Sequence, residues 1–186
     1  MDSSPTLGAL LLTESRYRLV TEYRTKIRAA VEALPADKVW WRPNEQSNSV
    51  GNLLVHLNGN IRQWILAGIG GQPDLRTRFA EFATRDGRPA AELLADLERT
   101  LVEADGALAR LPPPQLLERR IVQGRDLTVL ELISQVVQHV ALHTGQIIVI
   151  AKLHAPGAVR FTEDSANGLA RPLWKDLVRP ISPTSP

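Results

Sequence analysis

The chain contains no cysteine. Disulfides, cysteine-ligated metals and a cysteine nucleophile are therefore excluded, and any thiol chemistry requires a thiol from outside the chain. An excess of charge of one sign is also lacking, because 22 basic and 20 acidic residues leave a net charge of +2, with both signs mixed along the sequence. We expect no nucleic-acid partner, because a nucleic-acid-binding domain carries clustered basic side chains.

Long uninterrupted apolar runs are also lacking. The N-terminal sequence MDSSPTLGALLLTESRYR has an acidic residue at position 2 and an apolar run of only about six residues, too little for a signal peptide. The most apolar stretch, residues 127–154, is interrupted by Glu131 and by glutamines and histidines before 18 apolar residues accumulate. We therefore expect a cytoplasmic protein without a membrane span.

The 186 residues suit one domain with a sizeable core, and the sequence contains no internal repeat and no sign of a second domain. Apolar residues recur at helical spacing in four segments, and no segment is convincingly a strand of a larger sheet. These observations predict an all-α protein built as a four-helix bundle. The four segments span residues 6–34, 49–67, 89–111 and 127–154.

Turn and capping residues mark the ends of these segments. Pro35 ends the first helix, Ser49 is a suitable N-cap for the second, and Pro89 is a favoured first residue for the third. Residues 115–126 alternate apolar and polar side chains around a glycine, which predicts a short hairpin. Between the first two helices, the aromatic pair Trp40–Trp41 is expected to cover one end of the core, with a pocket wall as the alternative.

The connection between the second and third helices, residues 68–88, is long. It is rich in glycine and charge and contains the sequence RFAEFA, which is compatible with one helical turn. A connection of this length can carry the chain back along the bundle, so we expect the second and third helices to run parallel. We assign residues 1–155 to the bundle domain and expect residues 156–186 to form an extended, partly disordered tail.

Three of the four histidines are candidates for a metal site. His139 and His143 lie one turn apart on the same face of the predicted fourth helix, where both imidazoles can reach one ion. His56 lies in the middle of the second helix beside its apolar stripe and is the best third ligand. The alternative interpretation is that all three are hydrogen-bonded core or surface histidines. His154, at the end of the last helix, is expected to have a capping or solvent role.

The pattern around the histidine pair narrows the kind of metal site. Position 140 is a valine, so the HExxH motif of zinc proteases is absent. Three histidines with the remaining positions open to water are typical of a reactive rather than a structural metal site. Nearby Gln135, Gln138 and Gln146 could orient the ligands or a water, although ordinary polar packing explains each of them equally simply.

Glycines lie in the helices near all three histidines. Gly51, Gly59 and Gly145 each cost about 1 kcal/mol relative to alanine in a helix interior. Their presence suggests that backbones approach closely at these positions, or that space is being kept there.

Taken together, the segments SVGNLLVHLNGNIRQWI and HVALHTGQIIVIAKL resemble the DinB-like superfamily, which includes the YfiT-like metal-dependent hydrolases and thiol-dependent transferases. The similarity consists of a histidine in the second helix and an HxxxH pair in the fourth, followed by the Gly145–Gln146 step. It extends over about residues 6–154 and leaves out the tail.

The resemblance implies a four-helix bundle of up-down-down-up topology, in agreement with the long second connection. It also implies that His56, His139 and His143 bind one divalent metal, usually zinc or nickel. Similar proteins often form homodimers, and some members transform small molecules with a low-molecular-weight bacterial thiol such as bacillithiol or mycothiol. We therefore expect a small-molecule substrate and a thiol as a possible co-substrate.

These inferences give two functional hypotheses of different classes. The first is a metal-dependent enzyme of the thiol S-transferase or related hydrolase type, in which the metal activates a thiol or water near neutral pH. The second is a non-catalytic bundle that binds a metal or ligand in a stress response; a structural dimer without metal is a third possibility. The candidates for a general base or polar helper are Asn60, Asp126, Glu131 and Gln135.

Overall fold

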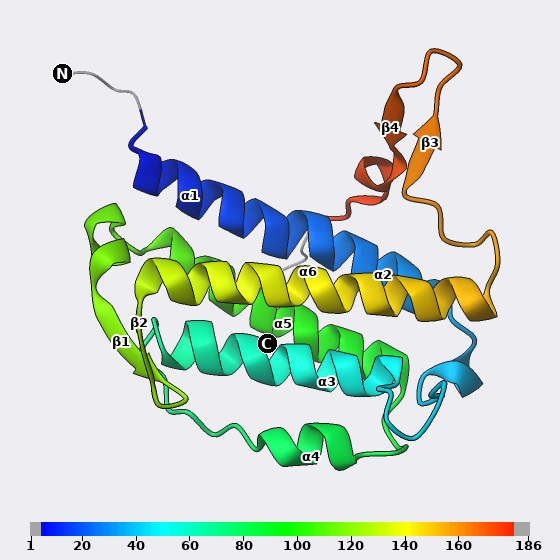
Figure 1. Cartoon of the computed structure of the whole chain (residues 1–186), viewed down its shortest axis with the longest axis horizontal. Helices are drawn as coiled ribbons and strands as arrows, with labels where there is room; N and C mark the ends of the chain where they lie inside the picture. Colours follow the sequence, from blue (N-terminus) through cyan, green and yellow to red (C-terminus); the bar gives the residue numbers. More distant parts are fainter. Residues whose placement is uncertain (1–4, 181–186) are drawn as a thin grey trace.

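The structure, a computed structural model, describes residues 5–180 and is mostly helical (Figure 1). The all-α expectation is therefore confirmed at the level of fold class. The first helical stretch contains α1 (Leu7–Arg16), the π-helical segment η1 (Tyr17–Tyr23) and α2 (Arg24–Ala33). The others are α3 (Val50–Ile61) with the π-helical η3 (Arg62–Ala67), α5 (Ala90–Ala109) and α6 (Val129–His154).

Capping boxes begin both helices that carry the candidate histidines. Before α3, the Ser49 side chain accepts a hydrogen bond from the Asn52 backbone N–H, and the Asn52 side chain accepts one from Ser49. Thr128 and Glu131 form the same reciprocal arrangement before α6. Two N–H groups are satisfied at each helix start, which fixes the first turn of both helices. The prediction that Ser49 caps the second helix is confirmed.

The two tryptophans lie in the loop between α2 and α3, which also contains the 3₁₀ turn η2 (Ala36–Lys38). Both are half-buried and pack against the core, as expected of residues that cover its end. Trp40 lies directly on Gly51, where a Cβ would come within 2.7 Å of the indole ring. Trp41 meets the ring of His154 edge-on at 4.3 Å between centroids.

The long connection after η3 carries the chain back along the outer side of α3 (Figure 1). Its RFAEFA sequence forms the short helix α4 (Arg78–Ala83), as predicted, and α4 packs beside α3. Glu81 of α4 is buried although it is charged, and Phe82 beside it is half-buried. The connection therefore places a carboxylate against a core helix.

Residues 113–128 form a 3₁₀ turn and a hairpin. The turn η4 (Pro113–Leu117) is followed by the antiparallel strands β1 (Arg119–Val122) and β2 (Arg125–Thr128). Gln123 and Gly124 between them have φ of 51° and 72°, the left-handed values that a tight two-residue hairpin turn requires. The predicted hairpin around Gly124 is confirmed, although it starts later than residue 115.

The core lies between the four long helical stretches, and its side chains come from all of them. α6 is central, because it contacts α2, α3 and both π-helical segments. By length and composition alone α6 could also span a membrane, but a core helix passes the same test. Fully buried core side chains include Leu19, Ile27, Leu53, Leu54, Leu57, Ile61, Ile65, Leu97, Leu101, Leu108, Leu132, Ile133 and Val136.

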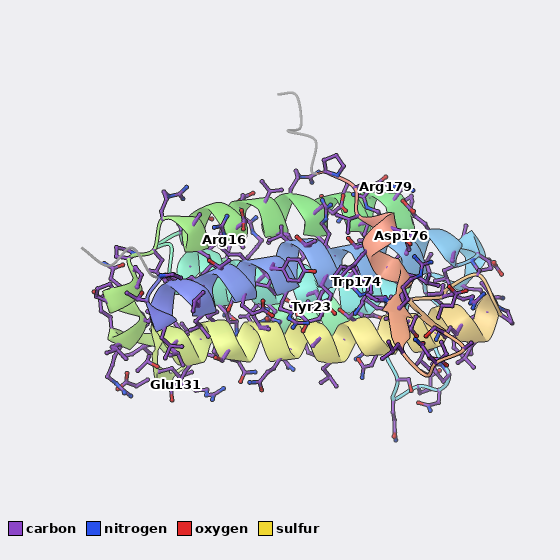
Figure 2. The ribbon with its side chains drawn as sticks, turned by 90° about the horizontal axis from the view of Figure 1, so that it is seen from above. Arg16, Tyr23, Glu131, Trp174, Asp176 and Arg179 are labelled. Atoms are coloured by element: carbon purple, nitrogen blue, oxygen red, sulfur yellow. The ribbon has the colours of Figure 1, made fainter. Side chains whose placement is uncertain are left out.

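The segment after α6 folds back onto the first helical stretch. It contains the antiparallel strands β3 (Thr162–Asp164) and β4 (Ala170–Pro172) and the 3₁₀ turn η5 (Leu173–Leu177). Figure 2 shows η5, which contains Trp174, lying against this stretch. The Trp174 ring is buried, 6.3 Å from the Tyr17 ring, and Lys26 Nζ lies 5.0 Å from its centroid.

Residues 162–177 thus form a hairpin and a 3₁₀ turn against the helices, and the predicted extended tail over residues 156–186 stays a prediction. The tail has few apolar residues, but Trp174 is large enough to anchor it, and Gly168 adopts the positive φ that lets β3 turn into β4. The predicted boundary at residue 155 stays a prediction, and the last part of the predicted tail, residues 181–186, lies outside the described residues.

Trp174→Ala should lower the free energy of unfolding by about 1.5–3 kcal/mol, because it removes a buried aromatic side chain. Urea denaturation of the full chain measures the loss. Leu177→Ala is the matched control, since Leu177 belongs to the same 3₁₀ turn but is 44% exposed. Equal losses in the two variants would contradict the role of Trp174 as the anchor.

Candidate metal centre

His56 of α3 and His139 and His143 of α6 converge at one point in the core. One ring nitrogen from each lies within 4.8 Å of the other two. The ring centroids are 4.4–5.0 Å apart, and the rings are inclined to one another by 69–90°. His56 and His143 are buried and His139 is half-buried. The three residues predicted as ligands are thus brought together.

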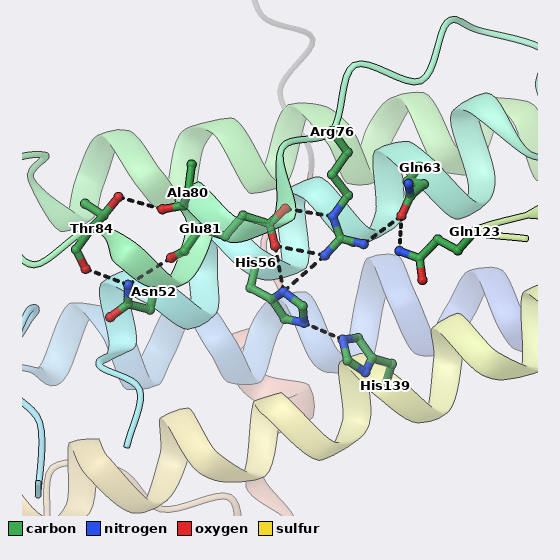
Figure 3. A network of polar contacts seen from close by, with 9 residues as sticks. All are labelled: Asn52, His56, Gln63, Arg76, Ala80, Glu81, Thr84, Gln123 and His139. Atoms are coloured by element: carbon green, nitrogen blue, oxygen red, sulfur yellow. Dashed lines mark hydrogen bonds and ion pairs between the residues drawn. The ribbon is translucent and has the colours of Figure 1, made fainter. Parts of the chain in front are cut away.

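The nitrogen positions fit one metal ion. The Nε2 atoms of His56 and His139 are 2.8 Å apart, as Figure 3 shows. Two nitrogens bound tetrahedrally to one zinc ion at about 2.1 Å lie about 3.4 Å apart, so the 2.8 Å pair would move slightly apart. The other nitrogens, all within 4.8 Å of one another, would shift by at most about 1.5 Å. These three histidines could therefore hold a divalent metal.

Glu81 of α4 orients the imidazole of His56. Its Oε2 lies 2.8 Å from His56 Nδ1 (Figure 3). A carboxylate can only accept here, so His56 Nδ1–H donates to Glu81 and the lone pair of Nε2 faces the other two histidines. Metal-binding histidines are commonly held by such an outer carboxylate, which fixes the tautomer and raises the basicity of the ligand.

Arg76 holds Glu81 in place. Its Nε lies 2.7 Å from Glu81 Oε1 and its Nη2 lies 2.8 Å from Oε2, a bidentate ion pair in which both side chains are buried. Arg76 Nη2 also lies 3.1 Å from His56 Nδ1. Nδ1 cannot accept that proton while it donates to the carboxylate, and the carboxylate is both closer and charged. We therefore assign the proton on His56 to Nδ1.

The carboxyl group of Glu81 is ionised at neutral pH. Burial by itself opposes ionisation, but the hydrogen bonds from Arg76 and His56 outweigh it and hold the Glu81 pKa below its usual range. Phe82, next in the chain, lies against the His56 ring with 4.7 Å between centroids. α4 thus supplies both a charged partner and an apolar cover for the same histidine.

Gln146 plays the corresponding part for His143. The side-chain oxygen of Gln146 lies 2.6 Å from His143 Nδ1, so Nδ1–H donates to the amide and leaves Nε2 as the metal-facing atom. Of the three glutamines considered from the sequence, Gln146 is therefore the one that orients a ligand. Two of the three imidazoles have their tautomers set by residues of the chain itself.

Burial keeps the two imidazoles of α6 neutral. Desolvation, and then repulsion from His143, His56, Arg76 and Arg78, lowers the pKa of His139 from 6.5 to about 4. Desolvation also lowers the pKa of His143, against the effect of its hydrogen bond to Gln146. Neutral imidazole is the form that binds metal, so the site is ready for a cation at neutral pH.

The glycines near the histidines differ in what they do. A Cβ on Gly59 would lie 2.2 Å from Glu81 Oε1 and 3.2 Å from Arg76 Nε, so only glycine lets the Arg76–Glu81 pair approach α3. At Gly145, a Cβ would meet nothing within 4 Å. Close approach is therefore found at Gly59 and Gly51, although by side chains and not by the expected backbones, whereas Gly145 keeps open space, the other possibility.

Two of the four candidate bases lie away from the site. Asp126 is exposed and pairs with Arg119 on the hairpin, with 3.0 Å between Oδ1 and Nε. Glu131 caps α6 at a distance of about 12 Å along the axis from His139, eight residues at roughly 1.5 Å each. Asn60 and Gln135 each lie one turn from a histidine. Asn60 is buried, and its side-chain oxygen has no hydrogen-bond partner among the described residues.

The sequence reasoning missed Glu81 and Arg76. Both lie in the connection between helices, where no periodic pattern links them to His56. The one available signal was Gly59, an unfavourable helix residue three positions after His56. It indicated that something must approach α3, but not which residue.

A family described as "Protein of unknown function (DUF1572)" matches residues 7–160 of the chain. The match covers most of the sequence, including every helix that contributes to the candidate centre, and the protein therefore belongs to this family. No protein with a curated description matches the sequence.

Gly59→Ala should weaken metal binding about 10–100-fold, because the added methyl group displaces the Glu81 carboxylate that orients His56. Competition with a chromophoric zinc chelator measures the affinity, and circular dichroism checks the fold. Gly145→Ala is the matched control: it should keep the affinity and raise the free energy of unfolding by up to about 1 kcal/mol. Wild-type affinity in Gly59→Ala would contradict the role assigned to Glu81.

The metal-free protein should lose stability as the pH falls from about 6.5 to about 4. The folded-state pKa of His139 is about 4, below the ordinary 6.5, so the unfolded chain binds more protons than the folded one in this interval. The expected loss is about 1–3 kcal/mol. Urea midpoints in the presence of a chelator measure it.

In this pH series, His139→Asn should flatten the dependence between pH 6.5 and 4, whereas His154→Asn, at the far end of α6, should not. An equally steep loss in His139→Asn and wild-type protein would show that another group is responsible.

Proposed function

We propose that this DUF1572 protein is a metal-dependent enzyme that binds one zinc or nickel ion through His56, His139 and His143. The reaction we favour is transfer of an external thiol to a small-molecule substrate, with a related hydrolysis as the nearest variant. The observation that carries the proposal is the convergence of the three imidazoles, with the Nδ1 atoms of His56 and His143 already engaged by Glu81 and Gln146. Chain residues thereby direct these Nε2 atoms to a common point.

The donor set supports an enzyme more than a structural metal site. Three nitrogen ligands leave coordination positions open, whereas structural zinc sites are closed by four protein ligands. A divalent metal here would supply the charge that deprotonates a thiol outright and lowers the pKa of water to near 7. His139 is half-buried, so the centre is reachable from its side.

The surrounding carboxylates favour a thiol over water as the nucleophile. Attack by water commonly employs a nearby group that takes up its proton. Glu81 has both oxygens engaged by Arg76 and His56, and Asp126 and Glu131 lie elsewhere. A thiol is acidic enough to react as thiolate without such a base. Since the chain has no cysteine, the thiol must come from outside.

A cavity beside the centre supports a small-molecule substrate. It has a volume of about 670 Å³, within the range of ligand sites, and lies between α6 and the loop before α3. Gln146, which orients His143, is part of its wall, and Gly145 leaves it open. No charged side chain lines it, so it suits the neutral, largely apolar part of a substrate.

We also propose that the helices form the DinB-like four-helix bundle with up-down-down-up order. The return of residues 68–89 along α3 supports this order, as does the position of one histidine on α3 and two on α6 (Figure 1). The homodimer and the cytoplasmic location stay predictions. A non-catalytic metal- or ligand-binding protein of a stress response is the alternative function.

Purified wild-type protein should contain, or take up on titration, one zinc or nickel ion per chain. His139→Ala should lose this metal, because it removes one of only three ligands. Elemental analysis and titration calorimetry measure the stoichiometry. His154→Ala, which changes the remaining histidine, should keep it; a wild-type protein that binds neither ion would overturn the metal site.

The metal-loaded protein should join bacterial low-molecular-weight thiols to at least one member of a panel of neutral electrophiles. Loss of thiol measured with a chromogenic reagent, and product mass, report the reaction. His139→Ala should be inactive. A loaded wild-type protein that transforms no member of the panel would favour the binding protein over the enzyme.

A further inference from the structure

A second cavity, of about 440 Å³, lies between the first helical stretch and the tail, away from the histidines. Its wall includes the side chains of Arg16, Arg24 and Arg179 and, as its one acidic residue, Asp105. Tyr17 and Thr21 add hydroxyl groups from the π-helical segment η1. Figure 2 shows Arg16 and Arg179 on this side of the molecule.

Arg24 is the unusual member of this wall, because it is charged and only 4% exposed. Its Nη2 donates to the backbone oxygen of Arg179. Its Nε has no hydrogen-bond partner among the described residues, and no carboxylate of the described residues forms an ion pair with it. Burial lowers the Arg24 pKa, which reflects the unfavourable desolvation of its charge.

The neighbouring charges of the described residues offset Arg24 only in part, because Glu98 attracts it but is itself paired with Arg28. Asp105 is engaged by Arg16 in a bidentate pair, with 2.7 and 3.0 Å between nitrogens and oxygens. Arg179 reaches Glu32 at 3.3 Å outside the cavity. The four charged side chains of the wall carry three positive charges and one negative charge. A buried cation whose charge is only partly offset by the described residues is unfavourable, and an anion in the cavity would offset it further.

The backbone conformation beside this cavity is also unusual. η1 interrupts an otherwise regular helix with a π-helical turn, and it supplies the wall residues Tyr17 and Thr21. π-helical segments are rare and occur frequently at functional sites, because they change the direction of side chains along a helix.

We propose that this cavity binds a small oxyanion, a phosphate or a carboxylate, with Arg24 as its main counter-charge. Arg179 adds a second positive charge from the tail, and the hydroxyls of Tyr17 and Thr21 donate hydrogen bonds to the oxygens. Guanidinium groups match the paired oxygens of both anions. Because the wall combines the first helical stretch with residues 178–180, the bound anion holds the tail against the helix. The site does not depend on the metal centre.

Thermal unfolding of the full metal-loaded chain in sodium phosphate and in sodium chloride of equal ionic strength tests the proposal. Phosphate should raise Tm by about 2–5 °C over chloride. Arg24→Gln should abolish this difference and weaken phosphate binding at least tenfold in titration calorimetry. Arg18→Gln is the matched control, because Arg18 belongs to η1 but not to the cavity wall.

A second anion and a second variant identify the ligand and show whether a folding defect explains the result. Succinate in place of phosphate separates a carboxylate ligand from a phosphate ligand, since the preferred anion gives the larger shift. Arg179→Gln, at the rim, should weaken binding while leaving the helices and the metal content unchanged. Equal Tm values in all three salts, or wild-type phosphate affinity in folded Arg24→Gln, would overturn the proposal.

Discussion

The contact between the buried carboxylate of Glu81 and the imidazole of His56 connects the fold to the candidate metal centre. It joins the crossover between α3 and α5 to the core helix α3, and it determines which nitrogen of His56 faces the other histidines. Gly59 leaves room for the contact, because a Cβ there would lie 2.2 Å from Glu81 Oε1. A helix position that is unfavourable by about 1 kcal/mol is thus explained by the orientation of a ligand one turn away.

A buried ion pair contributes little net stability, because desolvation of both ions offsets their attraction. The Arg76–Glu81 pair is therefore better understood as a device that gives the crossover one position. The pair is also tied to Gln63, because Arg76 Nη1 lies 2.9 Å from Gln63 Oε1 (Figure 3). Gln63 in turn forms hydrogen bonds with Gln123 and with Asp74. Through Gln123 the network reaches the hairpin before α6. The start of α3 joins the crossover as well, because the Asn52 side chain donates to the backbone oxygens of Glu81 and Thr84.

Sequence reasoning reached the parts of this arrangement that depend on periodicity. Helical spacing identified the four long segments and placed His139 and His143 on one face, and the alternation around Gly124 identified the hairpin. It could not reach Glu81, because α4 is only six residues long and its contact to His56 spans 25 residues of sequence. The contacts of the tail were out of reach for a similar reason, since Trp174 and Arg179 meet helices far away in the chain.

The positive charges beside the imidazoles also bear on the proposed reaction. Burial and the two neighbouring histidines account for most of the lowering of the His139 pKa, and Arg76 and Arg78 add to it because a second positive charge is unfavourable beside them. An anion beside His139 experiences the opposite effect, and the low effective dielectric of a half-buried site strengthens it. A thiolate approaching from the side of His139 would therefore be stabilised by the crossover as well as by a metal. In the proposed reaction the crossover would thus have two tasks: it orients His56 through Glu81, and its arginines would attract a negatively charged nucleophile.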